Sequence, residues 1–242
     1  KWLIGTGNFT TEEELMALEE PNRKPTFHSK NVGHCFVGID TAKHPDSTII
    51  TILRWNPERK NRKGDLEPKK EIINWGELHG ENYKDQFDII LDLFKNYNVE
   101  ALAIDSTGQG DFMPDMFERE SEWTDENSGL YRVKFSQVSK DAMYKNLKVT
   151  IKELLTVLPN LSTKHGERFK QQLLDLQQEY KGQLLSVKHP DEANAHDDYC
   201  DSWALAEWAF AKWSEQNNIS VSVINPTPER ERKVVKNESV EI

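Results

Sequence analysis

The sequence predicts an α/β domain with a mixed β-sheet, an antiparallel meander at its start and helices on both faces. The first observation is a run of three strand-like segments between residues 34 and 75, separated by polar turns. The second is a change of hydrophobic period after residue 80, from alternation to the three- and four-residue spacing of helices. The third is that helical and strand-like segments alternate from there on, which places helices on the faces of the sheet.

The meander is expected over residues 34–40, 47–55 and 71–75. The first segment is apolar, like a buried strand, and the second alternates and is rich in β-branched residues. The Lys-His-Pro-Asp between them is typical of a turn, and the polar residues 56–68 are typical of an exposed hairpin tip.

The helices are predicted from apolar stripes. Strands are expected between them over 100–104, 132–138 and 183–187, a short helix should end near residue 117, and the last helix should cover about 197–213. The stripes are Tyr83, Phe87, Ile90, Leu91 and Phe94; Met143, Leu147, Ile151, Leu154 and Leu155; Phe169, Leu173, Leu176 and Tyr180; and Tyr199, Trp203, Ala206 and Phe210.

The pattern divides the chain into three parts. Residues 1–33 are expected to form an N-terminal connecting segment, in which the capping-box spacing of Thr11 and Glu14 predicts a short helix over about 11–19. Residues 34–216 should form the α/β domain. Residues 217–242, with few large apolar side chains, are expected to be a tail that is ordered only in part. The start at Lys1 rather than Met suggests a fragment of a longer protein.

The composition is that of a globular, acidic protein. Hydrophobic residues make up 36% of the 242 residues, which is enough for a sizeable core. No apolar run reaches the roughly 18 residues that span a membrane and no signal peptide is recognisable, so we expect a cytoplasmic protein without a membrane partner. Cys35 and Cys200 are expected to be reduced thiols rather than a disulfide. The net charge of −10 argues against tight, autonomous nucleic-acid binding, but it suits a carboxylate cluster that binds cations.

Carboxylates stand where buried strands end. Asp40 ends the first strand, and Asp105 follows the strand over 100–104. If these strands are neighbours, both carboxylates emerge at one edge of the sheet. Asp197, Asp198 and Asp201 then open the last helix, where the N-terminus stabilises each negative charge by roughly 0.3–1 kcal/mol.

Three elements that each supply Asp suit Mg²⁺ or Mn²⁺, which prefer oxygen ligands. Two such ions about 3.5–4 Å apart can activate a water and stabilise the leaving oxygen of a phosphodiester. We therefore expect Asp40, Asp105 and the pair Asp197 and Asp198 to bind two ions and to be catalytic, with Asp201 as a further candidate ligand.

Each carboxylate also has a structural interpretation. Asp40 could be a turn residue, Asp105 could cap the helix after it, and one of Asp197 and Asp198 could be an ordinary N-cap. Asp201 can share a helix face with either member of the pair, or it could simply be exposed. The joint pattern of the acids favours a metal site over these separate explanations.

Three basic residues are candidate DNA contacts. Lys140 and Lys145 could touch phosphates, although a solvated helix face explains them as well. His196 could contact a phosphate or support a metal ligand, or it could cap the start of the helix.

The order of these motifs resembles the nuclease domain of the large terminase subunit of tailed bacteriophages. The resemblance covers about residues 34–213 and rests on Gly-Ile-Asp40, the hairpin with Asp46-Ser-Thr48, Ala-Ile-Asp105, and His196-Asp-Asp before Trp203-Ala-Leu-Ala. It implies a ribonuclease H-like fold and a metal-dependent endonuclease that cuts concatemeric viral double-stranded DNA during genome packaging, in the cytoplasm of the infected host cell. The family's first acid maps to Asp40, its second to Asp105 and its third to the pair at 197 and 198, while some relatives place an acid at the position of Asp201.

The same resemblance implies partners in the packaging motor: an ATPase domain, the portal and the small terminase subunit. The chain contains no Gly-x-x-x-x-Gly-Lys-Ser/Thr motif, so we expect the nuclease part without the ATPase part.

Three other functions are compatible with parts of the pattern. A junction resolvase or transposase on the same fold would use the same acids. A non-catalytic docking module of the packaging motor would keep the fold without the metal. An actin-like sugar kinase or chaperone ATPase shares the Gly-Ile-Asp strand, but it places a Gly-Thr or Gly-Ser phosphate loop where this chain has Thr41-Ala-Lys-His-Pro.

Overall fold

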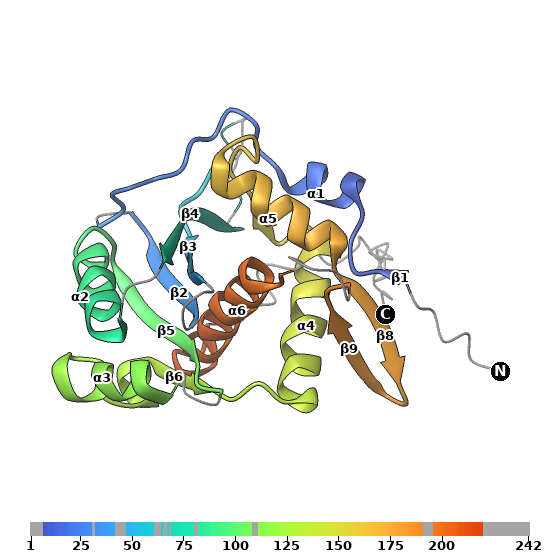
Figure 1. Ribbon diagram of the computed structural model, residues 1–242. Coiled ribbons are helices and arrows are strands. Elements are labelled where there is room, and N and C mark those ends of the chain that lie inside the picture. The colour runs from blue at the N-terminus through green and yellow to red at the C-terminus, as the bar shows by residue number, and fades with distance from the viewer. Residues whose placement is uncertain are drawn as a thin grey trace, which may run out of the picture.

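A computed structural model of the chain describes residues 7–30, 32–41, 47–60, 64, 67, 69–79, 82–107, 111–190 and 196–219. Its centre is a six-stranded mixed sheet with the strand order β6-β5-β2-β3-β4-β7 (Figure 1). The strands are β2 (His34–Asp40), β3 (Ser47–Asn56), β4 (Lys69–His79), β5 (Val99–Asp105), β6 (Leu130–Val133) and β7 (Thr156–Val157). Strands β2, β3 and β4 are antiparallel, and β5, β6 and β7 run parallel to the strands beside them, so the predicted mixed sheet with an opening meander is confirmed.

Helices cover both faces of the sheet, as predicted. On one face lie α4 (Gln137–Lys152), α5 (Lys164–Asp175) and the long α6 (Asp198–Gln216), which crosses the strands in Figure 1. Helices α2 (Tyr83–Phe94) and α3 (Phe112–Glu120) cover the other face, and the one-turn η2 (Glu126–Ser128) precedes β6. Each face has its own hydrophobic core, so the sheet is buried on both sides and its strands are nearly continuously apolar.

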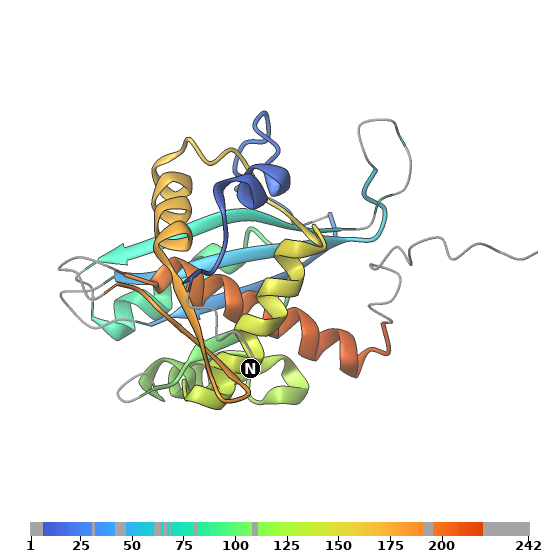
Figure 2. The same cartoon turned by 90° about the vertical axis from the view of Figure 1, so that its right-hand side faces the viewer.

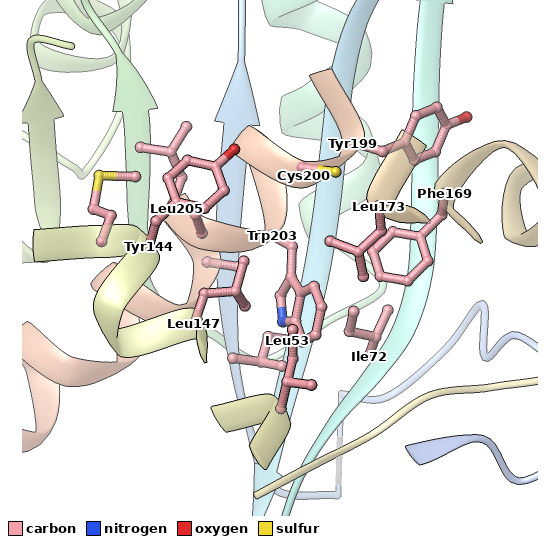
Figure 3. Close-up of a cluster of buried hydrophobic side chains, with 14 of the residues drawn as sticks. Leu53, Ile72, Tyr144, Leu147, Phe169, Leu173, Tyr199, Cys200, Trp203 and Leu205 are labelled. Carbon is pink, nitrogen blue, oxygen red and sulfur yellow. The ribbon is translucent and has the colours of Figure 1, made fainter. Parts of the chain in front are cut away.

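Helix α6 lies unusually close to the sheet, because β2 carries a glycine beneath it. A Cβ at Gly38 would stand 1.9 Å from the backbone oxygen of Ser202 and 2.4 Å from the backbone nitrogen of Ala206. Trp203 projects from this helix into the core that it forms with α4, α5 and the sheet (Figure 3). The absence of a side chain at position 38 therefore sets the height of α6 above the strands.

Buried polar contacts fix α6 along its axis. The hydroxyls of Ser202 and Thr51 are 2.6 Å apart. Glu207, which is fully buried, accepts hydrogen bonds from Thr156 at 2.8 Å, from the Trp203 indole at 3.2 Å and from Lys70. A buried charge is costly unless it is paired and hydrogen-bonded, so these partners specify one position of the helix.

A second, three-stranded sheet lies beside the domain. It consists of β1 (Gly7–Asn8) and the hairpin of β8 (Gln177–Lys181) and β9 (Leu184–Lys188), which turns at Gly182 with φ +67° (Figure 2). The hairpin is attached to α4, because the backbone N–H of Leu185 donates to Asp141 at 2.6 Å.

Three details of the predicted elements were wrong. The strand expected over 132–138 ends at Val133, because Ser136 and Ser139 form a capping box that starts α4. Leu154 follows the end of α4 and has a left-handed backbone, with φ 53°. Tyr180 belongs to β8 rather than to a helix, since α5 already ends at Asp175.

Helix α1 (Glu12–Leu18) confirms the capping box predicted from Thr11 and Glu14. Its Leu15 and Leu18, together with Phe9, are buried in the same core as α6. The division of the chain at residues 33 and 216 stays a prediction, and residues 220–242 of the expected tail lie outside the described part.

Both cysteine thiols are free and buried, as expected. None of the helices in the described residues is long and apolar enough to cross a membrane.

Candidate metal centre

The two strand-end carboxylates lie side by side. Strands β2 and β5 are parallel neighbours with Ile39 opposite Ile104, so Asp40 and Asp105 occupy the next position of the same row. Successive side chains of a strand alternate between faces. Phe36, four residues before Asp40, and Ala103, two residues before Asp105, belong to the core under α6. Both carboxylates therefore point to the α6 side of the sheet edge. The condition that β2 and β5 are neighbours, on which the sequence argument depended, is met.

The start of α6 brings three further carboxylates to this edge. Asp197 is the N-cap, Asp198 the first helical residue and Asp201 lies one turn later. Burial raises the pKa of Asp40 well above its usual value, and the charges of Asp201, Asp198, Asp105 and Asp197 raise it further, in that order. All five carboxylates therefore share one electrostatic environment, which we call the acid cluster.

Asp105 is held in place by the loop that follows it. It is 8% exposed, and its Oδ1 accepts hydrogen bonds from the hydroxyl and the backbone N–H of Thr107, at 2.6 and 2.9 Å. Burial raises the pKa of this carboxyl, and the bonds from Thr107 offset part of that rise. The hydrogen bonds from Thr107 thus orient the Asp105 carboxylate, which still faces the acid cluster.

Asp201 differs from the other acids, because both of its oxygens are occupied. Oδ2 is 2.6 Å from the ammonium of Lys140, and Oδ1 accepts a hydrogen bond from the Tyr144 hydroxyl at 2.5 Å. Its exposed fraction is 3%, and burial raises its pKa to about 6 although Lys140 lowers it. The interpretation of Asp201 as a merely exposed residue was wrong.

Lys140 is the cation of the acid cluster. Its ammonium also lies 3.5 Å from Asp197 and 4.6 Å above the ring of Phe135. Burial lowers the pKa of Lys140, but Asp201 and Asp197 raise it by more, so the side chain stays charged. The alternative of a solvated helix face was therefore wrong for this lysine.

The other two basic candidates are placed differently. Lys145 pairs with Asp141 at 2.7 Å and donates to the backbone oxygen of Gln183 at 3.1 Å, so it joins α4 to the hairpin and not to the cluster. His196 Nδ1 lies 3.7 Å from Asp198, at the start of α6.

Sequence reasoning missed Tyr144 and Glu77. Tyr144 follows Lys140 by four residues on α4, so the i,i+4 spacing could have placed both on one helix face. Glu77 is a 5% exposed carboxylate on β4, in the row of Asp40, with Ile49 between them. It contacts Arg168 and lies 3.8 Å from Lys164 and 3.2 Å from His79. No period or motif marks such a contact between β4 and α5.

The donor chemistry of the acid cluster fits a hard divalent cation. Its donors are all carboxylate oxygens, whose negative charges repel one another. The Lys140 ammonium already contacts two of these carboxylates. In the described residues, however, no group of three or more His, Cys, Asp or Glu side chains has the spacing of a metal site. The fit of the acid cluster to a cation therefore rests on the chemistry of its donors.

The fold is the ribonuclease H-like fold. Among solved structures, the chain is similar to the large terminase nuclease of the thermophilic phage G20c with bound cobalt (TM-score 0.60, 15% identity, 86% of this chain and 98% of that one). It is also similar to the same nuclease with bound magnesium (TM-score 0.59, 14% identity, 86% and 98%). A third similar structure is the large terminase of bacteriophage HK97 (TM-score 0.58, 9% identity), of which the chain spans 45% with 86% of its own length.

No protein-family model matches the chain, and no curated protein matches its sequence. The similarity to the terminase nucleases is thus one of fold, and it confirms the fold expected from the motifs.

Proposed function

We propose that this chain is the nuclease part of a phage large terminase, an endonuclease that cuts concatemeric viral double-stranded DNA during genome packaging. The observation that carries the proposal is the meeting of Asp40, Asp105 and the start of α6 at one edge of a ribonuclease H-like sheet. Solved structures of this fold include terminase nucleases with magnesium or cobalt bound, which supports a divalent cofactor.

Asp40, Asp105 and the pair Asp197 and Asp198 are the residues that would hold two Mg²⁺ or Mn²⁺ ions. When bound, such ions lower the pKa of a water and stabilise the leaving oxygen of a phosphodiester. The protein's own part is to orient the oxygens: Thr107 fixes Asp105, and the Lys140–Asp201–Tyr144 contacts anchor the start of α6. We further propose that the enzyme acts in the cytoplasm of the infected cell, with the ATPase domain, the portal and the small terminase subunit as partners.

The first test is cleavage of plasmid DNA by the purified chain. We expect nicking followed by linearisation with Mn²⁺ or Mg²⁺, little sequence preference because no base-reading motif is recognisable, and complete inhibition by EDTA. A four-way junction offered in the same assay separates the alternatives, since a resolvase would cut the junction at far lower enzyme concentration than linear duplex. Intact plasmid at high enzyme and Mn²⁺ concentration would favour the docking module.

The DNA backbone has a suitable contact surface beside the acid cluster. Two exposed cations, Lys164 and Arg168, lie beside Glu77 at the same sheet edge. The cluster and this surface are linked through α6, since the hydroxyl of Tyr199, next to Asp198, is 2.7 Å from His165 on α5. A chain of net charge −10 needs such a local concentration of cations to hold phosphates.

We therefore expect Lys164→Gln to weaken duplex binding and to reduce its salt dependence. Each phosphate contact contributes about 0.9 to the slope of log K against log salt concentration, so the slope should fall by about 1. Binding is measured by fluorescence anisotropy at several salt concentrations, in an Asp40→Ala background that prevents cleavage. Lys170→Gln, which removes the same charge from α5 but faces Glu12 at 2.6 Å, is the matched control. Equal slopes in both variants would remove Lys164 from the DNA path.

A further inference from the structure

Lys140 stands in an unusual place for a lysine, inside the acid cluster. Its side chain is 26% exposed, and its ammonium lies 2.6 Å from Asp201 and 3.5 Å from Asp197. It belongs to the first turn of α4, whose start is fixed by the capping box of Ser136 and Ser139. The lysine is thus delivered to the cluster by a rigid helix rather than by a loop.

Asp201 holds the lysine there. Because its two oxygens bind Lys140 and the fully buried Tyr144, this carboxylate is oriented by α4 and not by the other acids. An Asp that is oriented in this way is a good anchor for an ammonium.

Negative charge is concentrated around Lys140. Asp201, Asp198, Asp105 and Asp197 all act electrostatically on Asp40, and the Lys140 ammonium lies beside two of these carboxylates, those of Asp201 and Asp197. A divalent ion bound by Asp40 and Asp197 would therefore meet the Lys140 ammonium as a neighbour of like charge.

We propose that Lys140 is the built-in counter-ion of the acid cluster, which neutralises Asp197 and Asp201 before a divalent ion arrives and lowers the affinity of the site for that ion. Asp201 is its anchor. The inference rests on the proposed function, because it takes the acid cluster to be the metal site.

The direct test measures Mn²⁺ binding by calorimetry without DNA. Lys140→Met should bind Mn²⁺ about 10- to 100-fold more tightly than the wild type, in the range by which supporting groups change metal affinity. Without metal the variant should melt at a lower temperature, and saturating Mn²⁺ should restore most of the loss. Lys140→Arg keeps the charge and should stay within about threefold of the wild-type affinity. Lys140→Gln, whose amide can still donate to Asp201, gives a second neutral variant if the Met variant folds poorly.

A double-mutant cycle tests the role of Asp201. Asp201→Asn should weaken Mn²⁺ binding, since the released ammonium shifts its full charge toward Asp197 and Asp40. Adding Lys140→Met to that variant should restore wild-type affinity or better. If Asp201 were instead a ligand, the double variant would stay as weak as Asp201→Asn.

The outcomes distinguish this inference from the proposed function. Equal or weaker Mn²⁺ binding by Lys140→Met and Lys140→Gln, or no binding by any variant, would overturn the counter-ion role. Tighter binding by the neutral variants supports it, even if none of the proteins cuts plasmid, which would count against the nuclease alone.

Discussion

Replacing Asp40 by alanine should abolish metal-dependent cleavage and leave the metal-free protein at least as stable as the wild type. Asp40 belongs to the acid cluster, where burial raises its pKa and the charges of four other carboxylates raise it further. Loss of a ligand to the reacting metal removes several kcal/mol of transition-state stabilisation, which corresponds to a rate loss of about 1000-fold or more. The substitution also removes a negative charge that lies near other negative charges in the folded protein, so the metal-free fold should not lose stability.

The stability effect has a definite pH dependence. A carboxyl whose pKa is raised on folding contributes stability below its unfolded pKa, about 3.9, and loses that contribution as the pH rises through the folded pKa. Asp40→Ala should therefore melt above the wild type near pH 7–8, and this difference should vanish below about pH 4, where Asp40 is protonated in both states.

The measurement combines plasmid cleavage with thermal melts in EDTA. Asp92→Ala is the matched control, because Asp92 is an exposed carboxylate on α2 that pairs with Lys95 at 2.9 Å, and it should change neither quantity. Wild-type rates in Asp40→Ala, or a large fall in its melting temperature, would show that the carboxylate is structural.

A methyl group at position 38 should be strongly destabilising. In Gly38→Ala the new Cβ would stand 1.9 Å from a backbone oxygen and 2.4 Å from a backbone nitrogen of α6, and neither atom belongs to a flexible side chain. The helix must move away from the sheet, against the buried contacts of Ser202 and Glu207. We expect a destabilisation of about 3 kcal/mol or more, the upper end of overpacking costs, and a loss of cleavage because the α6 carboxylates move with the helix.

Denaturant unfolding and plasmid cleavage check this expectation. Gly7→Ala is the control, since nothing lies within 4 Å of a Cβ there, and it should change the free energy of unfolding by less than about 0.5 kcal/mol. A Gly38→Ala protein with wild-type stability would mean that α6 can shift freely, and the close contact would then not be what positions the acids.

Local patterns of the sequence were sufficient for the main elements. Alternation along β3, the stripe on α2 and the capping box before α1 all depend on neighbouring residues, so they predict structure without knowledge of the rest of the chain. The pairing of β2 with β5 entered the sequence argument only as a condition: if the two strands were neighbours, their terminal carboxylates would emerge at one edge, and the structure meets that condition.

Where local signals conflicted, the stronger one prevailed in the fold. In the sequence, the apolar stripe through Phe169 continues to Tyr180. In the structure, β8 pairs with both β1 and β9, and the hydrogen bonds of these strand pairs outweigh the helical period beyond Asp175. Similarly, β6 does not continue past Ser136, because the capping box of this residue satisfies backbone N–H donors at the start of α4.

The sequence by itself thus determined the class of fold, the carboxylates at the ends of two buried strands and the presence of further acids at the start of the last helix. Only the tertiary structure decided which side chains those further acids contact. Lys140 and Asp201 are 61 residues apart, and their contact depends on how α4 and α6 are seated on the sheet, which in turn depends on Gly38. The spacing of apolar residues shows which face of a helix is buried. It does not show which polar side chains of two distant helices will be in contact.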